Sequence, residues 1–187
     1  GPDARMPDIR APLEPELREL FAHYGIDHQQ DLVIDRKNAL SFGVVETAQG
    51  LAQVSHPATF LMSDVNRTVP FTRDLGALAM PGPSSLAISP DIEKNTELEF
   101  LPLISTAEVA VRRPASPKTL GYETLKNKSS DERPGPFVVA AALKGKMPSY
   151  YAGNPLPEGV TEDQLAKEAS DEARVLVVGS GEFFVSN

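Results

Sequence analysis

The apolar residues of this chain fall into short runs, and the first run has a helical period. Leu17, Leu20 and Phe21 lie at i, i+3 and i+4, with acidic residues in the first turn and a glycine after the last. This pattern predicts a helix over residues 14–24. The run DLVID that follows predicts a short strand at residues 31–35.

Most of the later runs predict strands. Between residues 39 and 62 the chain reads ALSFGVV, LAQV and ATFLM, which predicts short strands joined by turns. A further strand is expected near residues 75–80, before the turn segment PGPSS. Another is expected over ELEFLPLIST, where Pro102 requires a sheet edge or a bulge. The most continuous apolar runs are PFVVAAALK and RVLVVG, which predict buried strands.

Polar segments separate these runs. Residues 111–136 and 147–160 are rich in Pro and polar residues, so both are expected to be long loops. Within the first of them, Arg112 and Arg113 are expected to belong to a solvated face. The segment TEDQLAKEASDEAR predicts a short exposed helix with Thr161 as its N-cap.

Together these elements predict an α/β domain with a partial Rossmann-like, doubly wound sheet, β-rich insertions and long Pro-rich loops. Near-continuous apolar strands are typical of a sheet that is covered on both faces. We expect that sheet to contain residues 32–35, 137–143 and 174–178, with the last strand central. Because the chain starts at a helix and stops just past a core strand, residues 1–187 are expected to form a single soluble domain, the C-terminal portion of a larger one.

Composition and charge narrow the classes of function. The 187 residues include 18 Lys and Arg and 26 Asp and Glu, a formal net charge of -8, so no nucleic-acid partner is expected. The absence of cysteine excludes thiol catalysis, thiolate metal sites and disulfides. The three histidines are scattered without HxH or HExxH spacing, so neither a metal nor a cofactor is predicted.

The turn in VVGSGEF is the first candidate binding site. Strands of α/β sheets place ligands at their carboxyl ends, and backbone N–H groups there can hold an anion. The candidate residues are Gly179, Ser180, Gly181 and Glu182. The turn lacks both the GxSxG and the GxGxxG pattern, and the alternative that it is only a structural turn is favoured because glycine so often punctuates sheets.

Two further sets of residues are candidates for function. Tyr150 and Tyr151 present large faces with polar tips, which suits contact with carbohydrate or protein. The alternative, which is favoured, is that both tyrosines anchor a long loop to the core. A hydrolase would need Ser85 or Ser180 near a base such as His56, but nothing in the spacing of these residues selects them.

Three longer stretches carry a resemblance to a known family. They read LRELFAHYGIDHQQDLVIDRKN, VPFTRDLGALAMPGPSSLAI and RVLVVGSGEFFVSN. In this order they resemble the GldG-like auxiliary proteins of ABC-type transport systems, a group that includes a gliding-motility component and is related to the GIFT domain. The chain departs from the family pattern where Val69 replaces a histidine and where Ser180 and Gly181 replace Asp-Ser.

The resemblance implies a place and a role. It implies a periplasmic, extracytoplasmic domain that is anchored to the inner membrane in the full-length protein, beside an ABC permease and ATPase. We therefore predict a non-enzymatic accessory domain that mediates protein or glycan contacts. The alternative is an α/β hydrolase-like enzyme that uses Ser85 or Ser180.

Overall fold

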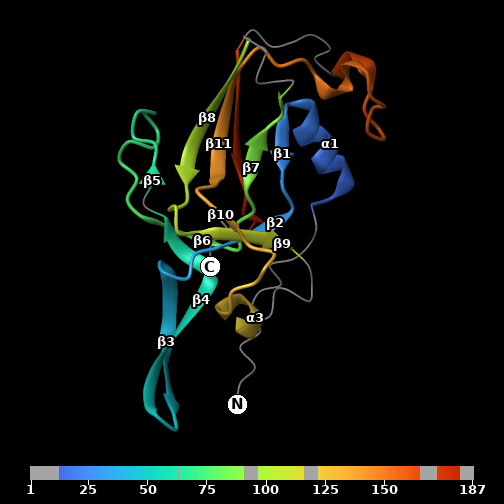
Figure 1. Cartoon of the computed structure of the whole chain (residues 1–187). Helices are drawn as coiled ribbons and strands as arrows, with labels where there is room; N and C mark the ends of the chain where they lie inside the picture. The colour runs from blue at the N-terminus through green and yellow to red at the C-terminus, as the bar shows by residue number, and fades with distance from the viewer. Residues whose placement is uncertain (1–12, 63, 91–96, 116–121, 165–171, 182–187) are drawn as a thin grey trace.

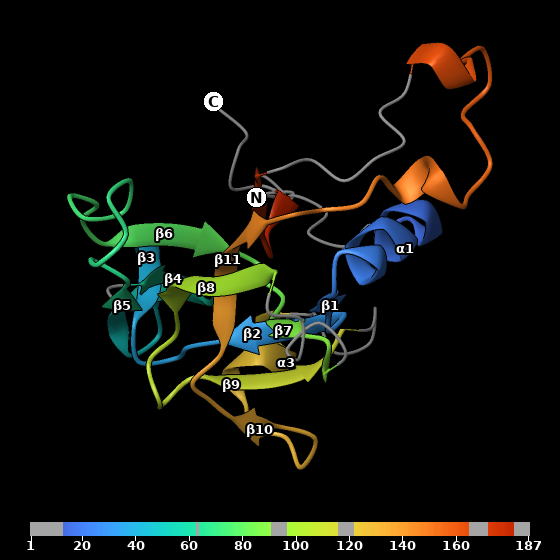
Figure 2. The ribbon, with the colours of Figure 1, turned by 90° about the horizontal axis from the view of Figure 1, so that it is seen from above.

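The computed structural model describes residues 13–62, 64–90, 97–115, 122–164 and 172–181, and it is built mainly of antiparallel strands (Figure 1). The strands form three sheets, which we name the central, crossing and hairpin sheets. The helix α1 (Pro15–His23) and the hairpin sheet lie on opposite sides of the central sheet (Figure 2). Within the described ranges, no helix combines the length and apolar character needed to cross a membrane.

The first predicted helix is confirmed. Helix α1 has Glu14 at its N-cap and Pro15 in its first turn, and Gly25 just beyond it has a φ of 74°, a value that favours glycine. Its residue Phe21, and Tyr24 just after it, pack against the central sheet. The chain then enters the sheet directly as its first strand, β1 (Ile26–His28).

The central sheet has the strand order β1-β7-β11-β8-β5, with β12 also paired to β11. Every pairing in it is antiparallel. The bulge expected at Pro102 is confirmed, because the register between β8 and β11 shifts beside that residue. The bounds of the remaining strands are β5 (Asp64–Val65), β7 (Leu86–Ile88), β8 (Leu98–Ser105), β11 (Val138–Gly145) and β12 (Ala173–Val178).

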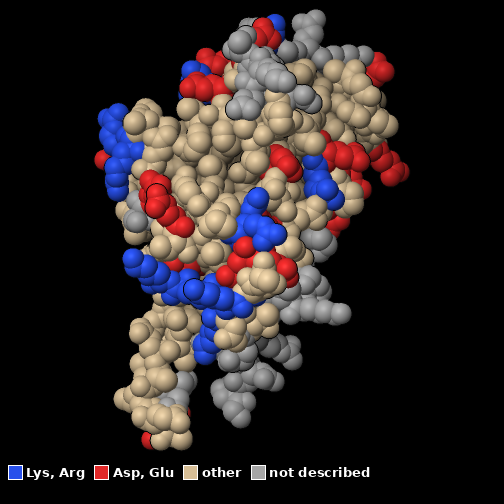
Figure 3. Space-filling model, viewed as in Figure 1, with Lys and Arg blue, Asp and Glu red and all other residues tan. Residues whose placement is uncertain are grey.

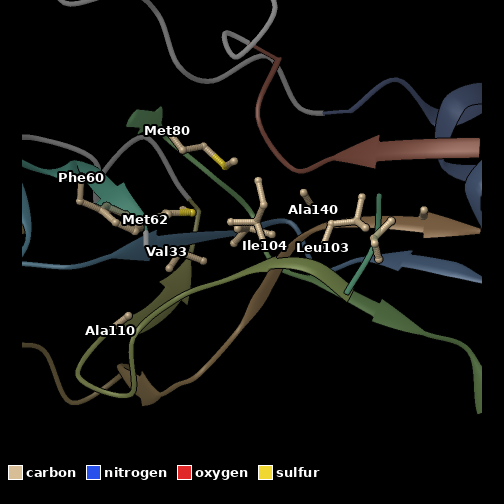
Figure 4. Packing of buried hydrophobic residues seen from close by; sticks show 11 residues of the cluster. Val33, Phe60, Met62, Met80, Leu103, Ile104, Ala110 and Ala140 are labelled. Atoms are coloured by element: carbon tan, nitrogen blue, oxygen red, sulfur yellow. The ribbon is translucent and has the colours of Figure 1, made fainter. Parts of the chain in front are cut away.

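Strand β11 is buried on both faces of the central sheet for most of its length. Ala141 and Leu143 point toward α1 and pack with Ile26, among others. Ala140 and its neighbours on the other face join a second cluster, in which Figure 4 shows residues of β8 and β11 beside residues of the hairpin sheet. That cluster consists of Val33, Phe60, Met62, Val69, Met80, Leu103, Ile104, Ala110, Val139, Ala140 and Ala142.

The other two sheets have three strands each. The crossing sheet consists of β10 (Arg133–Pro134), β9 (Val111–Pro114) and β2 (Asp31–Ile34), which confirms the strand predicted from DLVID. The hairpin sheet consists of β3 (Ala39–Thr47), β4 (Gly50–Met62) and β6 (Leu78–Pro81). The several short strands expected between residues 39 and 62 are therefore one long hairpin, which projects from the body of the molecule (Figure 1).

The predicted α/β, Rossmann-like fold class is wrong. Parallel strands need crossover connections, usually helices of a dozen or more residues, whereas the strands described here pair antiparallel and form separate sheets. The strand β2 belongs to the crossing sheet, not to the sheet of β11 and β12. The strand β12 is not central either, since β11 is its one partner among the described strands and its residues alternate between exposed and less exposed.

The segments expected to be loops have different outcomes. Described parts of residues 111–136 form β9, β10 and a short helix, α3 (Tyr122–Lys126), whose Leu125 is fully buried. Within residues 147–160 there is only one 3-10 turn, η1 (Tyr150–Ala152). The helix expected from Thr161 begins as a 3-10 turn, η2 (Glu162–Gln164), and the rest of it lies outside the described residues.

Candidate functional site

The three stretches that carry the resemblance meet at one place, which we call the motif junction (residues 31–35, 81–85 and 179–180). The N–H of Val33 donates to the carbonyl of Pro83 at 2.8 Å, which joins the first stretch to the second. The N–H of Ser84 donates to the carbonyl of Gly179 at 2.7 Å, which joins the second to the third. Segments far apart in sequence are thus held together by their backbones.

The glycine turn is packed into this junction. An added Cβ at Gly179 would lie 2.1 Å from the carbonyl oxygen of Ser84, so only glycine allows this approach. Ser180 is buried, and its hydroxyl donates to the carbonyl of Pro81 at 2.6 Å. Gly181 is exposed, whereas Glu182 lies outside the described residues. A structural role accounts for Gly179 and Ser180, and ligand binding at the turn stays a prediction.

A buried carboxylate organises the polar side of the junction. Asp31 is 6% exposed and accepts hydrogen bonds from the backbone N–H of Ser85 at 2.7 Å and from its hydroxyl at 2.6 Å. The guanidinium of Arg112 donates to Asp31 at 3.2 Å, to Ser85 Oγ at 3.1 Å and to Gln29 at 3.2 Å. Arg112 also lies 5.2 Å from the centroid of the Phe137 ring. These contacts tie the crossing sheet to the central sheet.

The cluster does not assemble the parts of a serine hydrolase in the described residues. The Ser85 hydroxyl is shared between a carboxylate and a guanidinium, and neither group is the imidazole base that would activate it. His56 is buried in β4, with its Nδ1 3.5 Å from the hydroxyl of Thr59. His28 lies in β1, and burial lowers its pKa below the ordinary value despite the opposing charge of Asp31.

A second charged cluster was missed by sequence reasoning. Arg113, expected to be solvated, is 2% exposed and pairs with Glu132, which also accepts from Arg36 at 2.5 Å. Burial raises the pKa of Glu132, but the hydrogen bonds from the two arginines outweigh it and lower that pKa below its ordinary value. The same guanidinium groups donate to carbonyls at the C-terminal end of α3, including that of Leu125 at 2.9 Å. This cluster is structural, since it fixes α3 to the crossing sheet.

Tyr150 lies against α1, and Tyr151 packs on Tyr150. The hydroxyl of Tyr150 donates to the carboxylate of Glu19 at 3.1 Å. The centroid of its ring lies 5.4 Å from that of His23 and 5.3 Å from that of Tyr151, both in edge-to-face geometry. His23 reaches the carbonyl of Pro148 at 3.2 Å. Tyr150 therefore anchors its loop to α1. The alternative that both tyrosines anchor the loop to the core, and carbohydrate contact by the pair, stay predictions.

The central sheet holds a groove of about 760 Å³ on the face that carries Ala142, and we call it the sheet groove. Its floor is a row of residues paired across three strands, with Ala142 between Leu101 and Leu176. The small side chain of Ala142 leaves the hollow, and a segment that includes Phe71 forms one wall. The next row on the sheet is charged, with Lys144 between Glu99 and Arg174.

The mouth of the sheet groove exposes large apolar side chains. Phe71 and Leu176 are 59% and 52% exposed, although both line the groove. Phe71 belongs to the stretch VPFT and Leu176 to the stretch RVLVV, so two of the three stretches supply it. Sequence reasoning missed the groove because it placed β12 in the centre of a covered sheet. An apolar floor with a charged end suits an apolar segment of a partner rather than chemistry.

Comparison with known proteins assigns one family. The whole chain, residues 1–187, matches the family described as ABC-type uncharacterized transport system. Neither the curated proteins nor the solved structures gave a significant match. No group of three or more His, Asp or Glu residues placed to hold a metal ion occurs in the described part of the chain.

Proposed function

We propose that this chain, which belongs to the family described as ABC-type uncharacterized transport system, is a non-enzymatic auxiliary domain that binds a protein of that system in the sheet groove. One observation carries the proposal: segments of the family-like stretches VPFT and RVLVV form the wall and the edge of an open apolar groove. The partner would be a permease subunit that inserts an apolar segment.

The chemistry of the groove supports a protein partner. Fully burying a Phe or Leu side chain contributes about 1.5–3 kcal/mol. Since Phe71 and Leu176 are more than half exposed, covering them would contribute roughly 1 kcal/mol or more each. The charged row at Lys144 would set the direction of the bound segment, because a charged flank of the partner can reach only that end.

The polar residues support a role without catalysis. The Ser85 hydroxyl donates a hydrogen bond to Asp31, and the Ser180 hydroxyl donates one to the carbonyl of Pro81. A serine without a base in reach is a poor nucleophile. We therefore expect no turnover of ester, peptide or phosphoester substrates by the purified chain, and turnover that Ser85→Ala or Ser180→Ala abolishes would support the hydrolase instead.

The extracytoplasmic location is part of the proposal and is supported by the resemblance alone. Protease treatment of spheroplasts that express the full-length protein would test it. We expect digestion of this domain without lysis of the inner membrane. Digestion only after lysis would refute the periplasmic location and leave the groove proposal untouched.

The groove itself is tested by co-purification with the permease and ATPase subunits of the same transport system. We expect Leu176→Asp to abolish co-purification while the chain stays folded, because the substituted side chain is exposed. Val109→Asp is the matched control, since Val109 is similarly exposed at 54% and lies outside the groove. Equal retention of the partner by both variants would overturn the proposal.

A further inference from the structure

A second cavity lies between α1 and the first strand of the central sheet, and we call it the helix pocket. Its volume is about 490 Å³, within the range of about 300–1,000 Å³ that is usual for sites of small molecules. One face of α1 forms a wall of the pocket, with residues at i, i+3, i+4 and i+7: Pro15, Arg18, Glu19 and Ala22. The helix pocket shares no residue with the sheet groove, so the two sites are separate.

The strand β1 forms the other side of the pocket with its backbone edge. Ile26, Asp27 and His28 all line the pocket, although successive side chains of a strand point to opposite faces. On the side of β7, Gly25 accepts a backbone hydrogen bond at 2.8 Å and Gln29 donates one at 3.1 Å. In an antiparallel ladder of this register, the N–H and C=O groups of Ile26 and His28 point away from β7. These backbone groups are therefore on the side where a ligand can bond them.

The helix pocket carries charges of both signs. Arg18 is the one Lys or Arg among the described residues that line it, and Glu19 and Asp27 are its carboxylates. Figure 3 shows acidic side chains over α1 with a basic patch among them. Burial holds the pKa of His28 below its ordinary value, so its ring adds no charge at neutral pH. A ligand of one sign would meet a like charge in this pocket, whereas a zwitterion matches both signs.

Arg18 is positioned by a residue with a strained backbone. The Arg18 guanidinium lies 3.0 Å from the side-chain oxygen of Gln30, which is a single acceptor for five N–H donors. Gln30 has a φ of 47°, and among the described residues it is the only one besides glycines with a positive φ. Such backbone strain concentrates at sites where a side chain must be held in one place. Arg18 is thus fixed at the pocket and keeps donors for a ligand.

The two carboxylates are positioned in the same way. Asp27 accepts a hydrogen bond from the side chain of Gln29 at 2.6 Å, and Glu19 accepts one from the hydroxyl of Tyr150 at 3.1 Å. An ionised carboxylate has about four lone-pair sites, so each group can accept further hydrogen bonds. Both carboxylates are therefore available to an ammonium group in the pocket.

We propose that the helix pocket binds a free α-amino acid with an apolar side chain, which is a function beyond that of the sheet groove. Arg18 pairs with the ligand's carboxylate, and Asp27 or Glu19 pairs with its ammonium group. The outward N–H and C=O groups of β1 bond the same two groups of the ligand. Phe21 and Ile26, which belong to the apolar cluster beneath α1, supply the surface for the ligand's side chain.

Isothermal titration calorimetry of the purified chain with L-leucine tests the proposal. We expect saturable binding with a dissociation constant of about 1 mM or tighter. N-acetyl-L-leucine has no ammonium group, like the C-terminal end of a peptide, and L-leucinamide has no carboxylate, like the N-terminal end. Each should bind at least about tenfold more weakly than leucine. No saturable binding of leucine, or equal binding of either blocked form, would overturn the proposal.

Substitutions in the chain test the place of binding. Arg18→Gln should weaken leucine binding about tenfold or more, whereas Arg67→Gln, at an exposed arginine outside the pocket, should leave it unchanged. Ala22→Leu keeps a good helix former at an exposed position and should abolish binding by filling the pocket, with an unchanged circular dichroism spectrum. An equal effect of the two arginine variants, or full binding by Ala22→Leu, would refute the site. Leu176→Asp should leave leucine binding unchanged, which separates this proposal from that of the sheet groove.

Discussion

Replacing Gly179 with alanine tests whether the motif junction is a tight structural contact. A Cβ at this position lies 2.1 Å from the carbonyl oxygen of Ser84 and 3.3 Å from that of Val139. Both are backbone atoms, so neither can swing away as a flexible side chain could. The N–H of Gly179 donates to Val139 at 2.8 Å and its carbonyl accepts from Ser84 at 2.7 Å. The end of β12 must therefore move, and both hydrogen bonds must stretch.

The expected cost follows from these contacts. Overpacking a tight site costs about 1–3 kcal/mol, and each weakened hydrogen bond adds up to about 1 kcal/mol. We expect Gly179→Ala to lower the free energy of unfolding by about 3 kcal/mol. Gly181→Ala is the matched control, because no atom lies within 4 Å of a Cβ built there. It should change that free energy by less than about 0.5 kcal/mol.

Urea unfolding followed by far-ultraviolet circular dichroism measures the difference. The two variants should unfold with the same dependence on urea but with well-separated midpoints. If Gly179→Ala matched Gly181→Ala, the close approach of Gly179 to Ser84 would not exist in solution. The third stretch would then not pack against the second at the motif junction as described.

Four further substitutions have defined outcomes. Val177→Asp should prevent folding, because an unpaired buried charge costs several kcal/mol, whereas Leu176→Asp beside it should leave the melting temperature nearly unchanged. Glu132→Gln leaves the buried Arg113 without its counter-charge and should cost about 3 kcal/mol at neutral pH. The pKa of Glu132 in the folded chain is lowered from 4.5, so the ionised carboxylate stabilises the fold above pH 4.5, and this stabilisation is lost as the pH falls through the folded pKa. The free energy of unfolding of Glu132→Gln should therefore fall less on acidification than that of the unchanged chain. Ser180→Ala should cost about 1 kcal/mol by removing a buried hydrogen bond, measurable by urea unfolding.

Local pattern in the sequence located several elements correctly. The helical spacing of Leu17, Leu20 and Phe21 predicted α1, and apolar runs predicted β2, β11 and β12 as strands. Pro102 predicted a sheet edge or a bulge, because proline cannot donate to the ladder, and the structure has a bulge there. These features depend on residues close in sequence, so the sequence alone was sufficient for them.

The candidate site was predicted only in part. The glycine turn was placed correctly at the end of a strand, and its structural role was the favoured alternative. The tight contact of Gly179 with Ser84 joins segments that are far apart in sequence, and no local pattern encodes it. The same holds for Arg113, whose proline-rich surroundings predicted exposure although Glu132 pairs with it in the interior.

The sequence by itself determined the first helix and several of the strands, which chemistries lack their residues, and which family the chain resembles. Only the tertiary structure decided that the strands are antiparallel, that β12 pairs with β11 and with no other described strand, and that the β3–β4 hairpin leaves the body. An apolar run records that a strand is to be buried, but not which strand pairs with it or in which direction. Those choices depend on packing between distant segments, and that packing also created the sheet groove.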